Sequence, residues 1–547
     1  MTPKFSVSSS ELQNYLKLAE AAVRAGDMRR AMQVAHEASA RGFEHPGLLT
    51  LAMQFELNAQ RPEQALLLAE RARKLAPRAL EVLRALASTY AALGRDREAI
   101  AAYDEALRQA PGNMDLRYNR GRLMEDMSKP ELARRDYERV LDSVPNHGPA
   151  LSRLAAIAGA AGRFAAARDY ATRALRINPR ETAASIVLAQ ADFADKNYES
   201  VMAIAKPLAS PSNPISVNRS IAHGLIADTL DAMGQHDEAY TAYTASNQAM
   251  RSHFKQFYEA LGTETVLSRS RRIVRYFQNA DIADWNKEPR PQSPVSTHVF
   301  LLGFPRSGTT LLEQVLGNHP AIETLEECDT LIETERDFFL PAGGLDAFAA
   351  AKDSELEPYR QSYWSIVRDN QIGLDHPAFV DKMPLNSFLL GAIARLFPDA
   401  KILLAIRDPR DVVLSCFRRR FGMSAKMYEL LTLEGAADFY AAAMEMCEIA
   451  REKFPMPFLV TRYEDLVGNF ESETRSLCEF LGVDFSAEMA NFAERAREKH
   501  VNTPSAAQVA QGLYTRGVDQ WRAYRAQIAP VLPRLAPWIA KFGYAEE

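Results

Sequence analysis

Residues 299–312 read Val299-Phe-Leu-Leu-Gly-Phe-Pro-Arg-Ser-Gly-Thr-Thr-Leu-Leu312. The apolar run is typical of a buried strand, and the Gly/Ser segment after it predicts a tight loop that opens onto a helix over 311–317. Backbone N–H groups at such a turn point outward, and the helix N-terminus adds partial positive charge. The stretch therefore predicts a strand–loop–helix unit that holds a phosphate group.

The spacing Gly303-x4-Gly308 imitates the P-loop of nucleotide-hydrolysing enzymes, but one residue differs. Thr309 stands where a P-loop carries the lysine that reaches the nucleotide phosphates. Arg306 supplies a cation from inside the loop instead. We therefore expect this loop to bind a nucleotide phosphate without triphosphate cleavage, which disfavours an ATPase or a kinase.

The composition is that of an ordinary soluble protein with two to four domains. The chain has 547 residues, of which 47% are hydrophobic and 25% charged, and its net charge of −5 gives no argument for a nucleic-acid partner. The four cysteines show no metal-type spacing, so we expect free thiols in a reducing compartment and no metal. Residues 1–10 lack signal-peptide features, and no stretch reaches the ~20 apolar residues of a membrane span. These features predict a cytoplasmic protein without a transmembrane segment.

A 34-residue period runs through the N-terminal half of the chain. Five units are clear over 12–179, a weaker sixth covers 180–211, and a seventh covers 221–250. The period resembles that of tetratricopeptide repeats, and it predicts paired helices that stack into a superhelix over 12–250. The residues that share the period are Pro77, Pro111, Pro145 and Pro179, then Ala31, Ala65, Ala99, Ala133 and Ala167, and then Gly26, Gln60, Gly94, Ser128 and Gly162.

The use of the repeat array stays open at this point. Such a surface suits a protein or peptide partner, but it also suits a homodimer interface or a purely structural scaffold. A helical connector over 251–294 follows, with a basic run at 269–275 and three prolines that mark a boundary. We read the basic run as a solvated helix face, with a phosphate or membrane-surface role as the alternative. The second domain is predicted over 295–547.

The C-terminal half reads as an α/β domain. Apolar runs at 298–302, 378–381, 401–406 and 458–461 predict strands, and long helical patterns separate them. Strands that alternate with helices predict a mostly parallel sheet covered on both faces. A polar cluster follows each strand, and ligands bind outside the carboxyl ends of such strands. We therefore expect the four clusters to converge in one crevice.

Each cluster also has a simpler interpretation. The run Arg407-Asp-Pro-Arg410 would be a salt-bridged helix start, Lys382 a surface lysine, and Tyr463 a core residue. One cluster alone proves little. Four of them at the ends of strands in one sheet favour a functional site.

Together, the loop 305–312 and the segment 396–415 resemble the sulfotransferases that use 3′-phosphoadenosine 5′-phosphosulfate (PAPS). The likeness covers about 295–544, and Lys382-Met-Pro and Tyr463-Glu-Asp-Leu are most similar to the tyrosylprotein sulfotransferase branch. The resemblance implies a multidomain protein, in which an all-α tetratricopeptide superhelix precedes an α/β P-loop-like sulfotransferase domain. It also implies PAPS as the co-substrate.

The resemblance assigns roles to individual residues. One group would grip the 5′-phosphosulfate, a second the 3′-phosphate, a third the adenosine, and a late segment over 503–521 would close over PAPS. Lys382, with Arg306, would lie near the transferring sulfuryl group. In that order, the groups are Arg306, Ser307, Gly308, Thr309 and Thr310; Arg407 and Ser415; Tyr463; and Ser505 and Arg516.

The catalytic base of that branch is a glutamate in a Glu-Glu pair. Glu327 matches it in this chain, with Glu326 as the alternative, while surface carboxylates are the simple interpretation. His319 lies nearby and reads as a turn histidine, although other branches use a histidine base. Asp329 stands where the tyrosine-specific branch has an arginine, which weakens any inference of an acidic peptide substrate.

Three functions remain in competition. The leading hypothesis is a PAPS-dependent sulfotransferase that acts on a hydroxyl of a protein or peptide recruited by the repeats. The second keeps the donor but uses a glycan or a small molecule as acceptor. The third is a repeat scaffold whose α/β domain binds nucleotide and does no chemistry.

Overall fold

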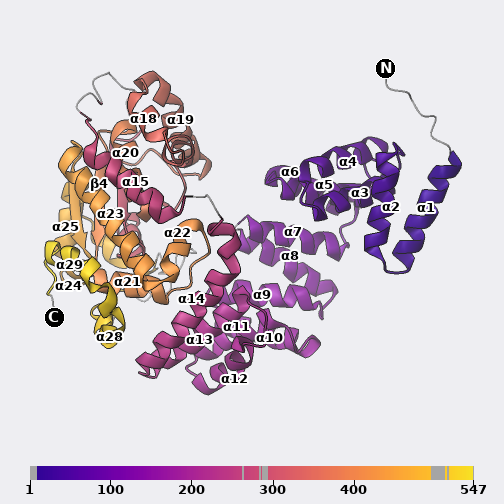
Figure 1. The fold of residues 1–547 in the computed structure, drawn as a ribbon, viewed down its shortest axis with the longest axis horizontal. Helices are drawn as coiled ribbons and strands as arrows, with labels where there is room; N and C mark the ends of the chain where they lie inside the picture. The colour runs from indigo at the N-terminus through magenta and orange to yellow at the C-terminus, as the bar shows by residue number, and fades with distance from the viewer. Residues whose placement is uncertain are drawn as a thin grey trace. The chain divides into compact units, whose positions relative to one another are not determined.

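The structure is a computed structural model, and it describes residues 9–127, 129–260, 264–282, 285, 293–494, 512–513 and 517–545. The chain divides into two compact units, Met1–Ala194 and Asp195–Glu547. Figure 1 draws the helices at the N-terminal end of the first unit in indigo and purple. The first unit is all-helical. Its helices are α1 (Ser9–Arg24), α2 (Met28–Ala40), α3 (Pro46–Asn58), α4 (Pro62–Leu75), α5 (Leu80–Ala92), α6 (Asp96–Gln109), α7 (Met114–Asp126), α8 (Pro130–Ser143), α9 (Gly148–Ala160), α10 (Phe164–Ile177) and α11 (Thr182–Ala194).

The 34-residue period has a structural cause in the first unit. The alanine register is fully buried, with Ala65, Ala99 and Ala133 each 0% exposed, because two helices approach each other closely there. The glycine register marks the turn between paired helices, where Gly94 has a φ of 68° and Gln60 a φ of 57°. Only glycine adopts that left-handed conformation without strain, which explains why glycine recurs there. Ser128, in the same register, lies outside the described residues.

The second unit begins with helices and continues into the α/β domain. The helices are α12 (Tyr198–Ala209), α13 (Val217–Ala232), α14 (His236–Tyr258) and α15 (Val266–Asn279). Gly234, between α13 and α14, repeats the positive φ at 77°. Ala239 and Tyr243 of α14 belong to the same apolar core as Phe277 of α15 and the α/β domain. The last repeat hairpin is therefore packed into the second unit.

A five-stranded sheet lies at the centre of the α/β domain. The strands are β1 (Thr297–Gly303), β2 (Ile322–Glu326), β3 (Ala378–Lys382), β4 (Lys401–Ile406) and β5 (Phe458–Arg462). They run in the order β2-β3-β1-β4-β5, and every neighbouring pair is parallel. The fold class predicted from the sequence is confirmed. β2 was not predicted, because it is a short edge strand interrupted by Glu323 and Glu326.

Helices cover both faces of this sheet. Val299 and Leu301 pack on the side of α16 (Thr309–Gly317) and α25 (Phe470–Leu481). Phe300 and Leu302, which alternate with them, face the larger core. The other elements are α17 (Ile332–Thr334), η1 (Glu335–Phe339), α18 (Gly344–Ala350), α19 (Asp353–Asp369), η2 (Pro384–Leu389), α20 (Leu390–Leu396), α21 (Pro409–Arg418), α22 (Ala425–Tyr428), η3 (Glu429–Leu431), α23 (Leu433–Lys453), α24 (Tyr463–Gly468), η4 (Ala487–Asn491), η6 (Gln520–Tyr524), α28 (Arg525–Ile528), η7 (Ala529–Val531) and α29 (Leu532–Lys541).

The chain changes direction between β1 and β4. After β1 it moves toward β2, and after β4 it moves toward β5. A crevice at the carboxyl ends of the strands is expected at such a switch point. The loops after β1 and β4 both lie there.

Candidate active site

The loop between β1 and α16 has a strained, tightly determined backbone. Arg306 has a φ of 74° and Gly308, which caps α16, a φ of 97°. A Cβ atom at Gly308 would lie 2.8 Å from Cδ2 of Tyr463. Both the conformation and the close approach therefore require glycine at this position. The first N–H groups of α16 lack partners within the helix, so the loop presents donors to an anion.

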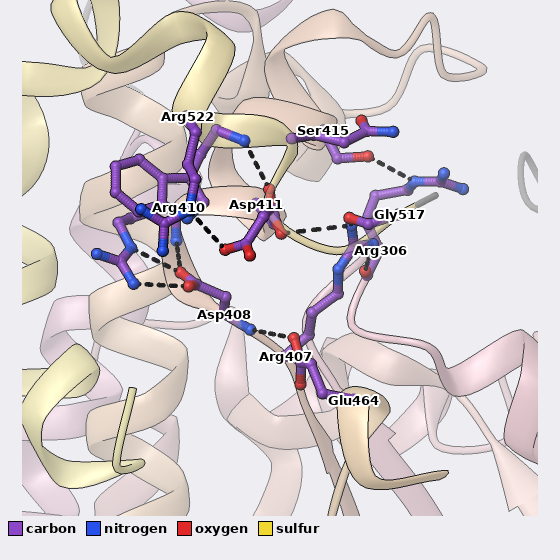
Figure 2. Close-up of polar contacts among 12 residues, drawn as sticks. Arg306, Arg407, Asp408, Arg410, Asp411, Ser415, Glu464, Gly517 and Arg522 are labelled. Atoms are coloured by element: carbon purple, nitrogen blue, oxygen red, sulfur yellow. Dashed lines mark hydrogen bonds and ion pairs between the residues drawn. The ribbon is translucent and has the colours of Figure 1, made fainter. Parts of the chain in front are cut away.

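Arg306 reaches across from this loop to α21. Its Nε donates to Oγ of Ser415 at 2.9 Å (Figure 2). Burial, together with the nearby positive charges of Arg419 and Arg407, lowers the pKa of Arg306 to about 10. Like charges gathered in this way favour a bound anion. Sequence analysis missed Arg419, although it lies one helical turn beyond Ser415.

Arg407 follows β4 and holds the loop from the other side. Its Nη1 donates to the carbonyl oxygen of Arg306 at 3.2 Å, and Nη2 donates to that of Gly517. Its guanidinium lies 5.0 Å from the centre of the Tyr463 ring. Its buried Nε has no hydrogen-bond partner among the described residues. Such an unsatisfied cationic donor fits an anionic ligand, since an unpaired buried polar group is costly.

The simpler interpretation of residues 407–410, a salt-bridged helix start, is correct for Arg410 but not for Arg407. Asp408 caps α21 by accepting from the backbone N–H of Arg410 at 2.9 Å, and its Oδ2 pairs with Nη2 of the same arginine at 2.7 Å (Figure 2). Arg410 also lies over the ring of Trp521 at 3.9 Å. For Arg407 the nearest carboxylate contact, with Asp411, is 3.9 Å. The run thus contains one structural arginine and one that faces the loop.

Lys382 ends β3 and lies between the two carboxylates of the Glu-Glu pair. Its Nζ is 2.7 Å from Oε1 of Glu327 and 3.5 Å from Oε1 of Glu326. The side chain of Lys382 is 0% exposed, so it is not a surface lysine. Burial raises the pKa of Glu326. Glu327 has a φ of 42°, and its N–H donates to the carbonyl oxygen of Lys382 at 2.8 Å.

One cavity of about 410 Å³ is lined both by the loop and by Glu327. Its lining includes Glu327 but not Glu326, and it includes Asp329. Further lining residues come from α15, from the segment after α21, and from α22. The lining residues are Val266, Arg269, Pro305, Arg306, Thr309, Thr310, Glu327, Asp329, Ile332, Glu335, Met383, Pro384, Leu385, Phe421, Ser424, Ala425, Lys426 and Met427.

The remaining candidates fall outside the cavity lining or the described residues. His319 uses both ring nitrogens in a turn: Nδ1 accepts from the N–H of Ala321 at 3.0 Å, so Nε2 donates to the carbonyl of Asp484 at 2.7 Å. This bonding matches a turn histidine. Ser505 and Arg516 lie outside the described residues, so their assigned roles stay predictions.

Two family models match the chain. The sulfotransferase family matches residues 298–487, and a tetratricopeptide repeat matches residues 80–123. Part of the repeat region is thus similar to tetratricopeptide repeats, and most of the α/β domain is similar to sulfotransferases. These two matches confirm the resemblance recognised in the sequence.

Individual relatives are distant. An uncharacterized protein of Aquifex aeolicus is 24% identical over 411 residues, which are 73% of this chain and 51% of that protein. The chain thus spans about half the length of that relative. Protein-tyrosine sulfotransferase 2 of Gallus gallus is 24% identical over 311 residues, 52% of this chain and 80% of that protein. The sulfotransferase domain of the Synechococcus PCC 7002 olefin synthase is 23% identical, with a TM-score of 0.31, over 43% of this chain and 91% of that one.

Proposed function

We propose that this chain transfers a sulfuryl group from PAPS to a hydroxyl carried by a protein or peptide. One observation carries the proposal: a single cavity is lined by both the phosphate-type loop and the carboxylate of Glu327. The hydrogen bond from Arg306 to Ser415 links that loop to the segment after β4. Donor-binding and proton-accepting groups therefore lie within reach of one another.

The donor site is assigned from the contacts around the loop. The N–H groups of α16 and the side chain of Arg306 would hold the 5′-phosphosulfate. Arg407 and the helix turn of α21 would hold the 3′-phosphate, and the ring of Tyr463 would lie against the adenosine. The residues in these roles are Arg306, Ser307, Gly308, Thr309, Thr310, Arg407, Ser415, Arg419 and Tyr463.

Glu327 serves as the general base in this proposal. The acceptor oxygen attacks sulfur while the bond from sulfur to the bridging phosphate oxygen breaks, and the acceptor proton passes to Glu327. The ammonium of Lys382 lies 2.7 Å from that carboxylate and forms an ion pair with it. Lys382 and Arg306 stabilise the charge that builds on the departing phosphate, since group transfer of this kind depends on positioning and electrostatics.

The cavity wall favours an acceptor with an apolar or aromatic body. Met383, Leu385, Phe421 and Met427 line it. A glycan hydroxyl placed against these four side chains would lack a hydrogen-bond partner and be costly to bury, although polar residues elsewhere in the lining offer partners: Arg269, Asp329, Glu335, Ser424 and Lys426. The repeat array supports a polypeptide acceptor. Because Asp329 also lines the cavity, we do not assign an acidic peptide.

Two measurements on the full chain test the proposal. Isothermal titration with 3′,5′-ADP should show binding, and the absence of binding would overturn the proposal. A transfer assay with labelled PAPS should then favour peptides with an aromatic hydroxyl over a matched oligosaccharide. Labelling of the oligosaccharide alone would shift the assignment to a glycan sulfotransferase. Binding without any transfer would favour the nucleotide-binding scaffold.

The cellular setting is also a proposal. Cys328, Cys416, Cys447 and Cys478 are all free, as expected in a reducing compartment such as the cytoplasm. Within the part of the chain that the structure describes, no helix is long and apolar enough to cross a bilayer. A homodimer and the domain limits 12–250, 251–294 and 295–547 stay predictions.

A further inference from the structure

Two carboxylates of α13 hold the segment that leaves α21. Asp231 forms an ion pair with Arg418 and accepts a hydrogen bond from the hydroxyl of Tyr524. Asp228 forms a second ion pair, with its Oδ2 2.6 Å from Nη2 of Arg420. Two arginines of one short segment are thus anchored to one helix of the last repeat hairpin.

The hairpin also packs directly against this segment. Nδ2 of Asn247, on α14, donates to the carbonyl oxygen of Phe417 at 2.9 Å, and Tyr240 stacks on the Phe417 ring at 5.3 Å. A Cβ atom at Gly224 would lie 2.3 Å from Nη1 of Arg420. The side chain of Arg420 therefore lies flat on the backbone of α13, where only glycine leaves room for it.

Arg419 lies between the two anchored arginines, directly after the last helical residue of α21, and its backbone is extended, with φ −90° and ψ 134°. Arg418 and Arg420 pair with the two carboxylates of α13. The positive charge of Arg419 adds to burial in lowering the pKa of Arg306, while Asp228 of α13 acts to raise the pKa of Arg419. The N–H of Arg419 also donates to the carbonyl oxygen of Ser415 at 3.1 Å.

We propose that Asp228 and Asp231 are positioning residues that hold Arg419 at the donor site. The last repeat hairpin would then contribute to binding of the donor nucleotide. This inference rests on the proposed function. Three consecutive arginines repel one another, and the two carboxylates offset the outer charges while fixing the direction of the middle one. Loss of either carboxylate leaves a partly buried guanidinium without its counter-charge, which is destabilising. The segment that carries Arg419 should then shift to expose that guanidinium to water.

Titration of the full chain with 3′,5′-ADP tests this role. Asp228→Asn and Asp231→Asn keep the side-chain shape, and each should raise the Kd for 3′,5′-ADP about 5- to 10-fold, approaching the effect of Arg419→Ala. The same substitutions in an Arg419→Ala background should have little further effect, since residues that act through one another are not additive. The KM for PAPS should rise while kcat at saturating donor stays near wild type.

A matched control lies on the same hairpin. Asp237, on α14, accepts a hydrogen bond from Gln527, so Asp237→Asn should leave the Kd for 3′,5′-ADP unchanged. If the aspartate variants do not fold, Arg420→Met removes one anchor from the other side. Wild-type affinity in folded variants, or an equal loss with and without Arg419, would overturn the inference. Failure of the wild-type chain to bind 3′,5′-ADP would instead overturn the proposed function on which it rests.

Discussion

The two ends of the site balance their charges in different ways. Near the ends of β1 and β4, burial and then the like charges of Arg419, which follows α21, and of Arg407 lower the pKa of Arg306. At the ends of β2 and β3, one ammonium, that of Lys382, lies between the carboxylates of Glu326 and Glu327. The first end gathers positive charge, and the second pairs positive with negative.

This difference separates binding from chemistry. A gathering of guanidinium groups suits an anion whose charge never changes, such as a phosphate. A carboxylate paired with an ammonium can accept a proton and give up its ion pair, which suits a group that changes charge during the reaction. The comparison holds only if substitutions at one end spare the function of the other.

The largest effect is expected from Glu327→Gln. The amide cannot accept the acceptor proton, and removal of a general base typically costs ~10²- to 10⁴-fold in kcat. The Kd for 3′,5′-ADP should stay within about two-fold of wild type, because the arginine end is untouched. Steady-state kinetics with labelled PAPS and titration with 3′,5′-ADP measure the two quantities. A variant that lost affinity for 3′,5′-ADP rather than kcat would break the comparison.

Arg407→Ala should show the reverse pattern. Hydrogen bonds to charged groups contribute about 1.5–3 kcal/mol, so the loss of this guanidinium should weaken 3′,5′-ADP binding about 100-fold. Arg410→Ala is the matched control, because Arg410 pairs with Asp408 instead of facing the loop. It should lower the melting temperature more than the affinity. Equal losses of affinity in the two variants would make both arginines structural.

Part of this arrangement was readable from the sequence because it depends on local chemistry. In a phosphate-binding loop of this kind, a strand, a glycine with positive φ and a helix start follow one another closely. The residues of 299–312 alone therefore sufficed to predict the strand–loop–helix unit. The repeat period was readable for the same reason: each hairpin needs a small residue at one contact and glycine at one turn. The strands at 298–302 and 401–406 followed from their apolar runs.

The rest depends on contacts between distant segments. Nothing near Arg419 indicates that Asp228 and Asp231 hold its neighbours from almost two hundred positions away. β2 was missed because an edge strand needs fewer apolar residues, yet it ends at Glu326 and so places the carboxylate pair beside Lys382. The ion pairs of Lys382 likewise follow from the order of strands in the sheet, which the sequence does not display.

Asp381, beside the carboxylate–ammonium end of the site, should make the stability of the fold depend on pH. It precedes Lys382 on β3 and accepts hydrogen bonds from Thr330 at 2.8 Å and Tyr363 at 3.0 Å. Burial raises the pKa of Asp381 from 3.8 to about 6. The folded state therefore holds this proton more tightly than the unfolded state, and its contribution to stability is present below about pH 4 and lost as pH rises to about 6.

The loss corresponds to roughly 3 kcal/mol. Asp381→Asn should remove this part of the pH dependence, because the amide oxygen still accepts both hydrogen bonds and carries no charge. Urea unfolding of wild type and variant at pH 4.5 and pH 7.5 gives the four free energies required. An equal pH dependence in both proteins would show that Asp381 is already ionised in the folded state at low pH.

Glu326→Gln should have the smallest effect on kcat. This variant tests which of the two carboxylates accepts the proton of the acceptor hydroxyl. Glu326 is 3.5 Å from Nζ of Lys382, against 2.7 Å for Glu327, and its side chain is 25% exposed, against 40%. It does not line the cavity, so we expect kcat to fall less than about five-fold and the Kd for 3′,5′-ADP to stay unchanged. Labelled-PAPS kinetics of the two glutamine variants, measured side by side, give the answer. A kcat loss in Glu326→Gln larger than that in Glu327→Gln would exchange their roles: Glu326 would be the base, and Glu327 would serve to hold Lys382 in place.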